Sequence, residues 1–450
     1  MLASFYMFQG RSLKTTWIVV LFVFILSVLL FFKEDNTVVK NRFIASQSEL
    51  RRNIASVLTP HIKNNDRPSI VTSSDLSLGF NMNTSDIYEV KYTIDEDLQK
   101  ESDKLLKQYK PDYGAVVMMD AKTGRILAMS SYVRADLGSE NLNLQATFPA
   151  ASIFKIITAA TVIDRKGLEP QHKIAYNGGS YTLHKQNVLS EKVNKWTHFI
   201  SLKDAFAKSI NTAFGRLTLE KLDPSDLEEY ARRFMFNKEI PSDFDIEMSQ
   251  ATIPMEKNYE LTKVASGYNR FNTMSPIHGA MIAGAIINNG QFVAPYIVDE
   301  IKQGDKTLYA AETYSIGQAI TAQSAKKVQA MMEQTVLSGT SRKTFRQIIK
   351  EKKFREIEMG GKTGHFSGLN PKGTNDWFVG YATDGDNKIA IAAITVNIKK
   401  WTVKSSMLAK LMIRQHFKTI LEEKEISKKL DQQRQDNDRN LVADRRPNKS

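Results

Sequence analysis

The chain has 450 residues, 42% of them hydrophobic and 25% charged, a composition typical of a globular protein with core enough for two or more structural units. It has no cysteine, which excludes disulfides and thiolate metal sites, and its seven histidines show no ligand spacing, so we predict neither metal nor cofactor. The net charge of +13 is spread along the chain, which favours an anionic membrane or polymer over a nucleic-acid partner.

The N-terminal part of the chain predicts one membrane anchor. The uncharged run WIVVLFVFILSVLLFF, residues 17–32, spans roughly 24 Å as a helix, or about 27 Å with the two threonines before it, enough for a thin bilayer. Arg11 and Lys14 precede it, which indicates a cytoplasmic segment 1–16 and an extracytoplasmic remainder. The polar exit KEDN lacks the small residues of a cleavage site, so we expect an uncleaved, single-pass signal anchor.

Composition divides the rest of the chain into three parts. Residues 33–90 form a polar juxtamembrane segment with one amphipathic helix predicted at 48–62. Residues 91–420 alternate strand and helix patterns and form a large folded module. Residues 421–450 have too few apolar side chains to pack, so we expect a disordered tail or a frayed helix.

Periodicity and turn residues predict several elements within the module. A strand and an amphipathic helix fill 90–109, and 114–132 forms a β-hairpin around the turn DAKTG. A buried helix is predicted in 148–164, beginning at Pro149, followed by a mostly helical middle region. A second hairpin is predicted at 376–396 around DGDN.

Ser152 and Lys155 stand three residues apart in the predicted buried helix, so both side chains lie on one face of its first turn. One interpretation is a lysine that extends from a core helix to solvent, and the other is a base that activates a serine. A lysine that acts as a base near pH 7 needs a pKa about three units below its value in water. Burial and the positive end of a helix both act in that direction.

The stretch EMGGKTGHFSG, residues 358–368, contains the Gly-Lys-Thr order of a phosphate-binding loop. Such a loop needs a further glycine where this chain has Glu356, whose carboxylate would repel phosphate. A nucleotide site is therefore disfavoured. Two interpretations stay open: a turn leading into the next strand, or a strand edge that presents Lys362 and Thr363 to a substrate.

Each short motif is weak by itself. Ser-x-x-Lys recurs at Ser324 and Lys327 in a polar stretch, and duplicates also exist for the Ser-x-Asn of Ser209 and Asn211 and for the Lys-Thr-Gly that starts at Lys362. The motifs at Ser152, Ser209 and Lys362 form the series in which every member has apolar surroundings suited to a site. Their order and context therefore select them.

With these motifs in this order, the chain resembles the transpeptidase module of penicillin-binding proteins, within the wider group of penicillin-recognising serine enzymes. The similarity runs from about residue 90 to 415 and includes, in family order, YTIDEDLQ, AVVMMDAKTGRILAM, ISLKDAFAKSINTAF, MSPIHGAMIAGAIINNGQFVAPYIV and DWFVGYATD. The resemblance implies an α+β, serine β-lactamase/transpeptidase-like fold, with an antiparallel sheet flanked by helices and a mostly helical subdomain.

The resemblance also implies catalytic residues. Ser152 is the nucleophile that forms an acyl-enzyme with a D-alanyl-D-alanine peptide, and Lys155 takes its proton. Ser209 passes that proton towards the leaving amine. Asn211 holds the lysine and the substrate amide in place.

A second set of implied residues lies on the Lys-Thr-Gly strand. Lys362 keeps the site electropositive and attracts the substrate carboxylate, to which Thr363 offers a hydroxyl. Gly364 leaves room for the peptide beside the strand. The backbone N–H groups of Ser152 and His365 form the oxyanion hole.

The chain departs from the family pattern at three positions. Ala151 and Ile153 flank the serine where members commonly have Gly and Thr, and His365 follows Lys-Thr-Gly where members usually have Thr or Ser. The lost hydroxyl would normally help to bind a carboxylate. We therefore expect altered substrate preference and weaker acylation by β-lactams, against the alternative that His365 packs or points to solvent.

The expected function is that of a membrane-anchored D,D-transpeptidase that cross-links peptidoglycan stem peptides, is inhibited covalently by β-lactams and works beside a separate glycan polymerase. One alternative is a D,D-carboxypeptidase or a class D-like β-lactamase, either of which hydrolyses the acyl-enzyme; Asn211, where that β-lactamase class has valine, disfavours the latter. Another is a non-catalytic β-lactam sensor or a structural component of a cell-wall complex.

Overall fold

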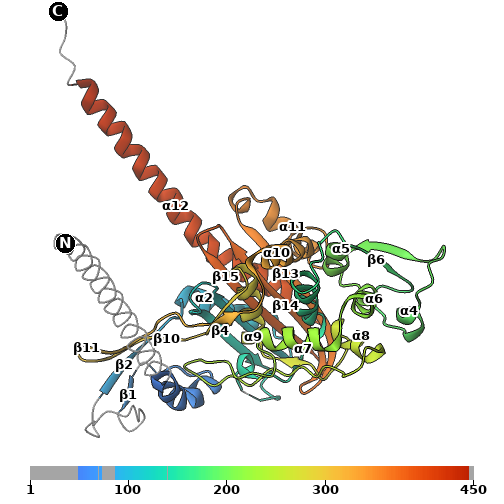
Figure 1. Cartoon of the computed structure of the whole chain (residues 1–450). Helices are drawn as coiled ribbons and strands as arrows, with labels where there is room; N and C mark the ends of the chain where they lie inside the picture. The colour runs from blue at the N-terminus through green and yellow to red at the C-terminus, as the bar shows by residue number, and fades with distance from the viewer. Residues whose placement is uncertain (1–48, 69, 73–86, 139, 445–450) are drawn as a thin grey trace, which may run out of the picture.

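The computed structural model describes residues 49–68, 70–72, 87–138 and 140–444, and Figure 1 shows a body built around a central sheet from which one long helix projects. The predicted anchor at 17–32 and the segment before it lie outside the described residues. Within the described ranges, no helix combines the length and apolar character that a membrane crossing requires.

The central sheet is five-stranded and antiparallel, with the order β13-β14-β15-β3-β4. Its strands are β3 (Tyr113–Asp120), β4 (Ile126–Val133), β13 (Glu358–Leu369), β14 (Lys372–Thr383) and β15 (Lys388–Asn397). Both predicted hairpins are confirmed, as β3–β4 and β14–β15. The stretch that resembled a phosphate loop is strand β13, which stands at the end of the order and therefore leaves one edge unpaired in this sheet.

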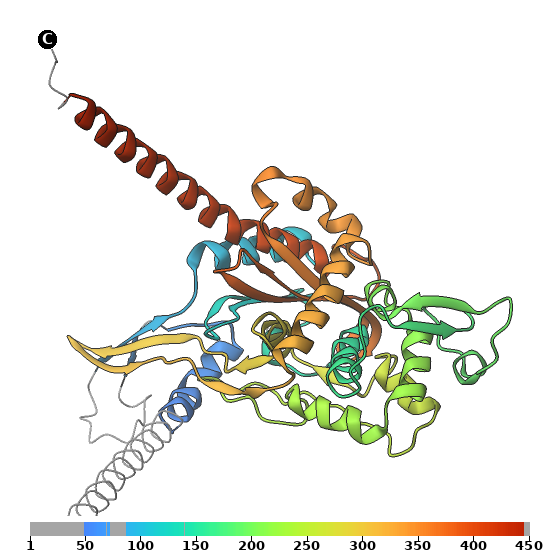
Figure 2. The same cartoon turned by 45° about the horizontal axis from the view of Figure 1, so that its top comes forward.

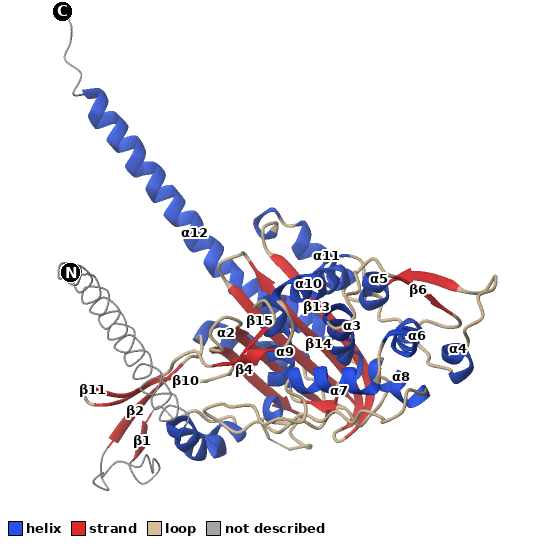
Figure 3. Cartoon of the chain, viewed as in Figure 1, coloured by secondary structure: helices blue, strands red, loops and turns tan. Residues whose placement is uncertain are grey.

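Helices cover both faces of this sheet (Figure 3). One face packs on α2 (Glu96–Tyr109), α11 (Arg342–Lys350) and the first turns of α12 (Ser405–Asp444). The other face packs on α3 (Lys155–Asp164), α9 (Pro276–Ile287) and α10 (Ala322–Leu337). Two apolar layers thus hold the sheet between them.

Local chemistry explains where α2 and α9 begin and how they pack. Helix α2 starts at Asp95, whose carboxylate accepts hydrogen bonds from two backbone N–H groups of the first turn at 3.0 Å. Helix α9 starts after Ser275, with Pro276 in its first turn, and all of its residues are buried, as expected for a helix that is apolar on every side. A Cβ at Gly279 would lie 3.0 Å from Val379 of β14, so glycine allows this helix to approach the sheet closely.

The predicted helical middle is present beside the sheet. Its helices are α4 (Lys185–Leu189), α5 (Leu202–Ala207), α6 (Asn211–Lys221), α7 (Pro224–Arg233) and α8 (Tyr259–Ala265). The short strands β6 (Lys173–Tyr176) and β7 (His198–Ser201) form an arm with α4 (Figure 1). Further short elements are η1 (Leu142–Leu144), β5 (Phe148–Pro149), η2 (Ala151–Phe154), β8 (Thr273–Met274), β9 (Gln291–Val293), β12 (Ser315–Gln318) and η3 (Lys352–Phe354).

The start of the buried helix differs from the prediction. Phe148 and Pro149 form strand β5, which pairs with β8, and a 3-10 turn precedes α3, which begins at Lys155. The indole of Trp377 donates to the Pro149 carbonyl at 2.9 Å, and the Ala150 N–H donates to the Asn272 carbonyl at 2.8 Å. These tertiary bonds hold the chain extended where the local sequence predicted a helix.

The predicted boundary at residue 91 falls inside a strand. Strand β2 (Ile87–Tyr92) pairs with β1 (Ile70–Thr72) and β10 (Val298–Gln303) in a sheet that also contains β11 (Lys306–Ala310). Residues 49–63 are helical, as predicted, and bury Ile54, Leu58 and Ile62 in the main core. Part of the expected juxtamembrane segment therefore belongs to the folded module.

The expected tail is helical up to Asp444 as the continuation of α12, which extends away from the body (Figure 2). The first turns of this helix bury Leu408, Met412 and Phe417, whereas Ile426 and Leu430 further along are exposed. Ion pairs four residues apart, such as Lys429 with Glu425, support the exposed part. Of the predicted tail, residues 421–444 are described as helix.

Candidate active site

Ser152 lies in the 3-10 turn η2. Its position depends on a close contact between two residues with positive φ, Ala151 and Gly267. Ala151, directly before it, has φ +49°, in the left-handed region that favours glycine. This explains why family members commonly have glycine there. Gly267 has φ +65°, and a Cβ on it would lie 1.8 Å from the Ala151 carbonyl oxygen. The turn that carries Ser152 therefore rests directly on the backbone of residue 267.

This contact predicts a large cost for a small substitution. Gly267→Ala should lower the free energy of unfolding by about 3 kcal/mol, from a steric overlap and a strained φ, and should slow acylation of Ser152 because the turn must move. Gly167→Ala is a matched control, since Gly167 has φ +66° but no atom within 4 Å of the added Cβ. We expect it to lose only about 1 kcal/mol. Equal losses in thermal or urea unfolding would show that the contact with Ala151 is not tight.

Lys155 is fully buried, and its Nζ makes three polar contacts. Nζ lies 2.9 Å from Ser152 Oγ, 2.6 Å from Asn211 Oδ1 and 2.5 Å from the Ser266 carbonyl oxygen. Burial, with the charge of Lys362 as the second cause, holds the pKa of Lys155 well below its usual range. The structure thus excludes the interpretation of a lysine that reaches solvent.

The contacts determine how a neutral Lys155 is oriented. The two carbonyl oxygens can only accept, so they take the two N–H groups of the amine. The Asn211 amide is oriented in this sense because its Nδ2 donates to the Tyr181 carbonyl at 2.8 Å. The remaining lone pair of Nζ faces the hydroxyl of Ser152, which is the arrangement required to remove the serine proton.

Ser209 and Lys362 form a second pair beside the first. Ser209 has φ +56° in the turn between α5 and α6, and its Oγ accepts a hydrogen bond from Lys362 Nζ at 2.9 Å. Lys362 Nζ also donates to the Thr363 carbonyl at 2.9 Å. Burial lowers the pKa of Lys362 to about 7. Burial thus lowers the pKa of both lysines, and Lys362 carries its charge below about pH 7.

Strand β13, which has a free edge, passes close to Ser152. A Cβ on Gly364 would lie 3.3 Å from the backbone nitrogen of Ser152 and 3.3 Å from the side chain of Ile153, so the absence of a side chain permits this approach. The structure thus supports the strand-edge interpretation of the Lys-Thr-Gly stretch. It places His365, the next residue, at the same edge.

Sequence reasoning missed three parts of the site. Thr340, in the loop between α10 and α11, lies with its Oγ1 2.6 Å from Thr363 Oγ1, and its N–H donates to the Ala207 carbonyl at 3.0 Å. The Ser266 carbonyl accepts from Lys155. Backbone carbonyls of the 179–182 loop accept from the side chains of Asn211 and Thr212. Most of these contacts use backbone atoms. The Gly-Thr pair at 339–340 was the one available sequence signal.

His365 is half-exposed and paired with a buried acid. Its Nε2 lies 2.6 Å from Asp376 Oδ1, and their side chains are 46% and 3% exposed. The ring also packs against Trp401, with centroids 5.3 Å apart. His365 therefore packs, as the alternative expectation allowed, and it is also paired with an acid.

The duplicate motif has a structural use instead. Ser324 Oγ lies 2.9 Å from the hydroxyl of Thr321, the residue that caps α10, while Lys327 pairs with Glu169 at 2.6 Å. Its serine and lysine are thus engaged with separate partners. Among the described residues, no group of three or more acidic or histidine side chains could hold a metal ion.

Comparison with known proteins agrees with this geometry. Residues 114–413 match the model of the penicillin binding protein transpeptidase domain. Peptidoglycan D,D-transpeptidase PbpA of Mycobacterium tuberculosis is 26% identical over 344 residues, which cover 68% of this chain and 67% of PbpA. Stage V sporulation protein D of Bacillus subtilis is 25% identical over 298 residues, and the match covers 61% of this chain but 44% of that protein. PbpA of Mycolicibacterium smegmatis is 25% identical, and 62% of its length is covered.

Solved structures share the fold. The D,D-transpeptidase domain of a peptidoglycan glycosyltransferase from Eggerthella lenta aligns with a TM-score of 0.61 at 24% identity, covering 74% of this chain and 83% of that chain. Penicillin-binding protein A of M. tuberculosis, in its imipenem acyl-enzyme complex, aligns with a TM-score of 0.61 at 21% identity, covering 77% and 82%. The predicted α+β architecture, with its sheet and helical region, is confirmed by these likenesses.

Proposed function

Because the chain belongs to the penicillin-binding protein transpeptidase family, we propose that it is a serine D,D-transpeptidase that cross-links peptidoglycan stem peptides through an acyl-enzyme on Ser152. The observation that carries this proposal is the position of the buried Lys155 amine. Its Nζ lies within hydrogen-bond distance of Ser152 Oγ and of two carbonyl oxygens that take its N–H groups. In the neutral amine, the remaining lone pair then faces the Ser152 hydroxyl.

In the first half-reaction, Ser152 Oγ attacks the carbonyl carbon of the D-Ala-D-Ala peptide bond while Lys155 takes its proton. The edge of β13 supports an oxyanion hole made by the backbone N–H groups of Ser152 and His365, the same pair that the resemblance implies. The proton then reaches the leaving amine through Ser209, whose Oγ is held by Lys362. The charge of Lys362 attracts the substrate carboxylate.

The acyl-enzyme then has two possible fates. An amine from a neighbouring stem peptide forms a cross-link, whereas water releases the peptide as a carboxypeptidase would. A β-lactam acylates the same serine because its strained amide replaces the peptide bond. Hydrolysis of that adduct would make the protein a β-lactamase, and failure to turn over any peptide would leave it a sensor or a structural component.

We also propose that residues 17–32 anchor the module at the outer face of the cell membrane. The uncharged run and the basic residues before it support this placement. The 58 residues at 33–90 that separate the run from the predicted module leave little room for a second enzyme. A separate protein would then supply glycan polymerisation.

Labelling tests the proposed site directly. We expect a fluorescent penicillin to modify the purified protein at Ser152, identified by peptide mass spectrometry, and Ser152→Ala to abolish labelling. Ser324→Ala removes the serine of the duplicate motif and should label like the wild type. Modification at any other serine, or labelling of Ser152→Ala, would refute the assignment. Turnover of a thioester donor by the wild type separates an enzyme from a sensor.

A further inference from the structure

His365 and Asp376 are direct neighbours across β13 and β14, and a second contact holds the acid in place. While Asp376 Oδ1 contacts His365 Nε2 at 2.6 Å, its Oδ2 accepts the backbone N–H of Ser405 at 2.7 Å, at the start of α12. The Ser405 hydroxyl donates to the Asp376 carbonyl at 2.6 Å. A buried carboxylate with both oxygens engaged cannot turn away, so it orients the imidazole.

The acid also determines which ring nitrogen is available. A carboxylate only accepts, so Nε2 of His365 carries a proton, and in the neutral ring Nδ1 has a free lone pair. A serine or threonine hydroxyl at this position would instead donate to a substrate carboxylate. The substitution therefore changes the position from a hydrogen-bond donor to a proton acceptor, as in a Ser-His-Asp arrangement.

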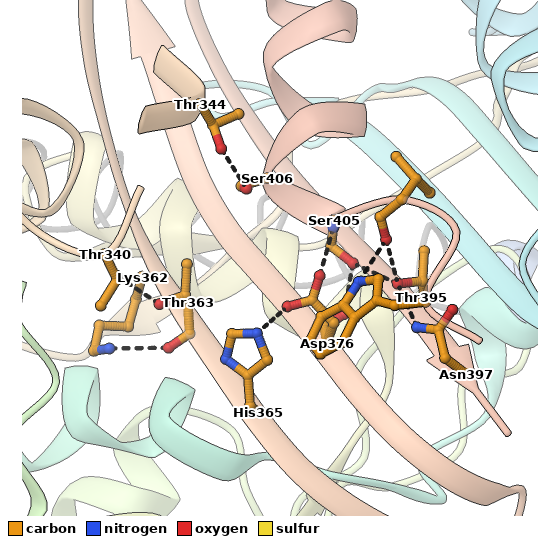
Figure 4. A network of polar contacts seen from close by, with 12 residues as sticks. Thr340, Thr344, Lys362, Thr363, His365, Asp376, Thr395, Asn397, Ser405 and Ser406 are labelled. Carbon is orange, nitrogen blue, oxygen red and sulfur yellow. Dashed lines mark hydrogen bonds and ion pairs between the residues drawn. The ribbon is translucent and has the colours of Figure 1, made fainter. Parts of the chain in front are cut away.

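The pair lies one residue along β13 from the position that contacts the turn of Ser152. In Figure 4 the imidazole is turned towards Asp376, and Lys362 and Thr363 lie further along the same strand. The preceding residue, Gly364, approaches the backbone nitrogen of Ser152. Because side chains alternate along a strand, the His365 ring stands on the face of β13 opposite to Lys362 and Gly364, half-exposed at the free edge of the sheet. The proposed function brings the acceptor peptide to this edge.

The net charge of His365 and Asp376 indicates which substrate group they would attract. With a neutral ring, the pair carries one negative charge from Asp376, and with a protonated ring it is neutral overall. In neither state does it offer a net positive charge to a carboxylate, a role left to Lys362. An approaching ammonium group is attracted to the first state and can give up a proton to Nδ1.

We propose that His365, oriented by Asp376, is the proton acceptor for the amine of the acceptor peptide in the second half-reaction. The inference rests on the proposed transpeptidase function. The ammonium gives one proton to Nδ1, and its nitrogen then attacks the ester carbonyl of acyl-Ser152. The C–N bond forms, the C–Oγ bond breaks, and the second nitrogen proton reaches Ser152 Oγ through Lys155. The imidazolium releases its proton to water. His365 is thus a catalytic residue, and Asp376 is a positioning residue.

The test separates formation of the acyl-enzyme from its capture. A D-alanyl thioester acylates the purified protein in the presence of D-alanine or D-alaninamide, and mass spectrometry gives the ratio of aminolysis to hydrolysis products. We expect His365→Asn to lower this ratio about 10- to 100-fold more than it lowers the acylation rate, with both amines, as for loss of a general base. Asp376→Asn should lower it about tenfold. Ser367→Ala, two residues along the same strand, is the control and should change neither quantity.

Each other outcome is decisive. An unchanged ratio in His365→Asn, with the melting temperature preserved, overturns the inference and leaves the transpeptidase proposal intact. A loss confined to D-alanine would show that His365 binds a carboxylate and not the amine, which also overturns it. Failure of the wild type to be acylated would instead refute the proposed function itself, and the inference with it.

Discussion

Replacing Lys155 with methionine should lower the rate constant for acylation of Ser152 by penicillin about 10³-fold. The amine of Lys155 is the proposed base, and a positioned base contributes about 10²- to 10⁴-fold. Methionine has a similar length and is apolar, so it fills the buried position without a charge. A stopped-flow or gel-based time course with fluorescent penicillin measures the effect.

The Lys155→Met variant should also differ from the wild type in how its stability depends on pH. Folding lowers the pKa of Lys155, so between its folded and unfolded pKa values the unfolded chain binds the extra proton, and stability is lost as pH falls through that window. Lys155→Met lacks this loss. Its melting temperature relative to the wild type should therefore rise as pH is lowered from 10 to 6.

A matched control uses the duplicate motif. Lys327→Met removes a lysine whose partner, Glu169, is exposed, so neither acylation nor the pH dependence of stability should change appreciably. If Lys155→Met retained acylation within tenfold of the wild type, Lys155 could not be the base. The alternative base would then have to be found among the groups around Ser209.

Raising the pH from 6 to 9 should slow acylation by a carboxylate-bearing penicillin about tenfold or more. The pKa of Lys362 is about 7, so its charge is present below that pH and mostly absent at pH 9. A buried charge that attracts the ligand carboxylate contributes at least the 1.4 kcal/mol that corresponds to a factor of ten. Rates at subsaturating penicillin across this pH range measure the effect.

Substitutions at Lys362 distinguish charge from shape. Lys362→Arg keeps its charge throughout the range, so the alkaline fall should disappear even if the rate is lower overall. Lys362→Met should be slow at every pH. If the acylation rate of Lys362→Arg fell between pH 6 and pH 9 as much as that of the wild type, another group would be responsible for the fall.

The lowered pKa of Lys362 also makes the stability of the protein depend on pH. Folding lowers the pKa of Lys362 from the ordinary lysine value of about 10.4 to about 7, a penalty of roughly 4 to 5 kcal/mol that is fully present below pH 7 and fades as pH rises towards 10. Lys362→Met should therefore gain more stability over the wild type at pH 6 than at pH 10. Urea unfolding at the two values measures the difference.

The local features of this protein were predictable from the amino-acid sequence by itself. The Ser152–Lys155 pair depends on a spacing of three residues, which survives the change from a predicted helix to a 3-10 turn because both conformations place such residues on one side. Both hairpins follow from alternating apolar strands and turn residues close in sequence. The order of the three motifs then led to the family, which the match over 114–413 confirms.

The tertiary structure alone decided how distant parts meet. Ser209 and Lys362 are 153 positions apart, and the fold brings them into contact. The lowered pKa of Lys155 results mainly from complete burial, which no local pattern encodes. Gly267 and Thr340 act mainly through backbone contacts, which leave little trace in residue type. Asp376 reached His365 through the β13–β14 register, a pairing that was not predicted because long-range contacts, and not periodicity, select strand partners.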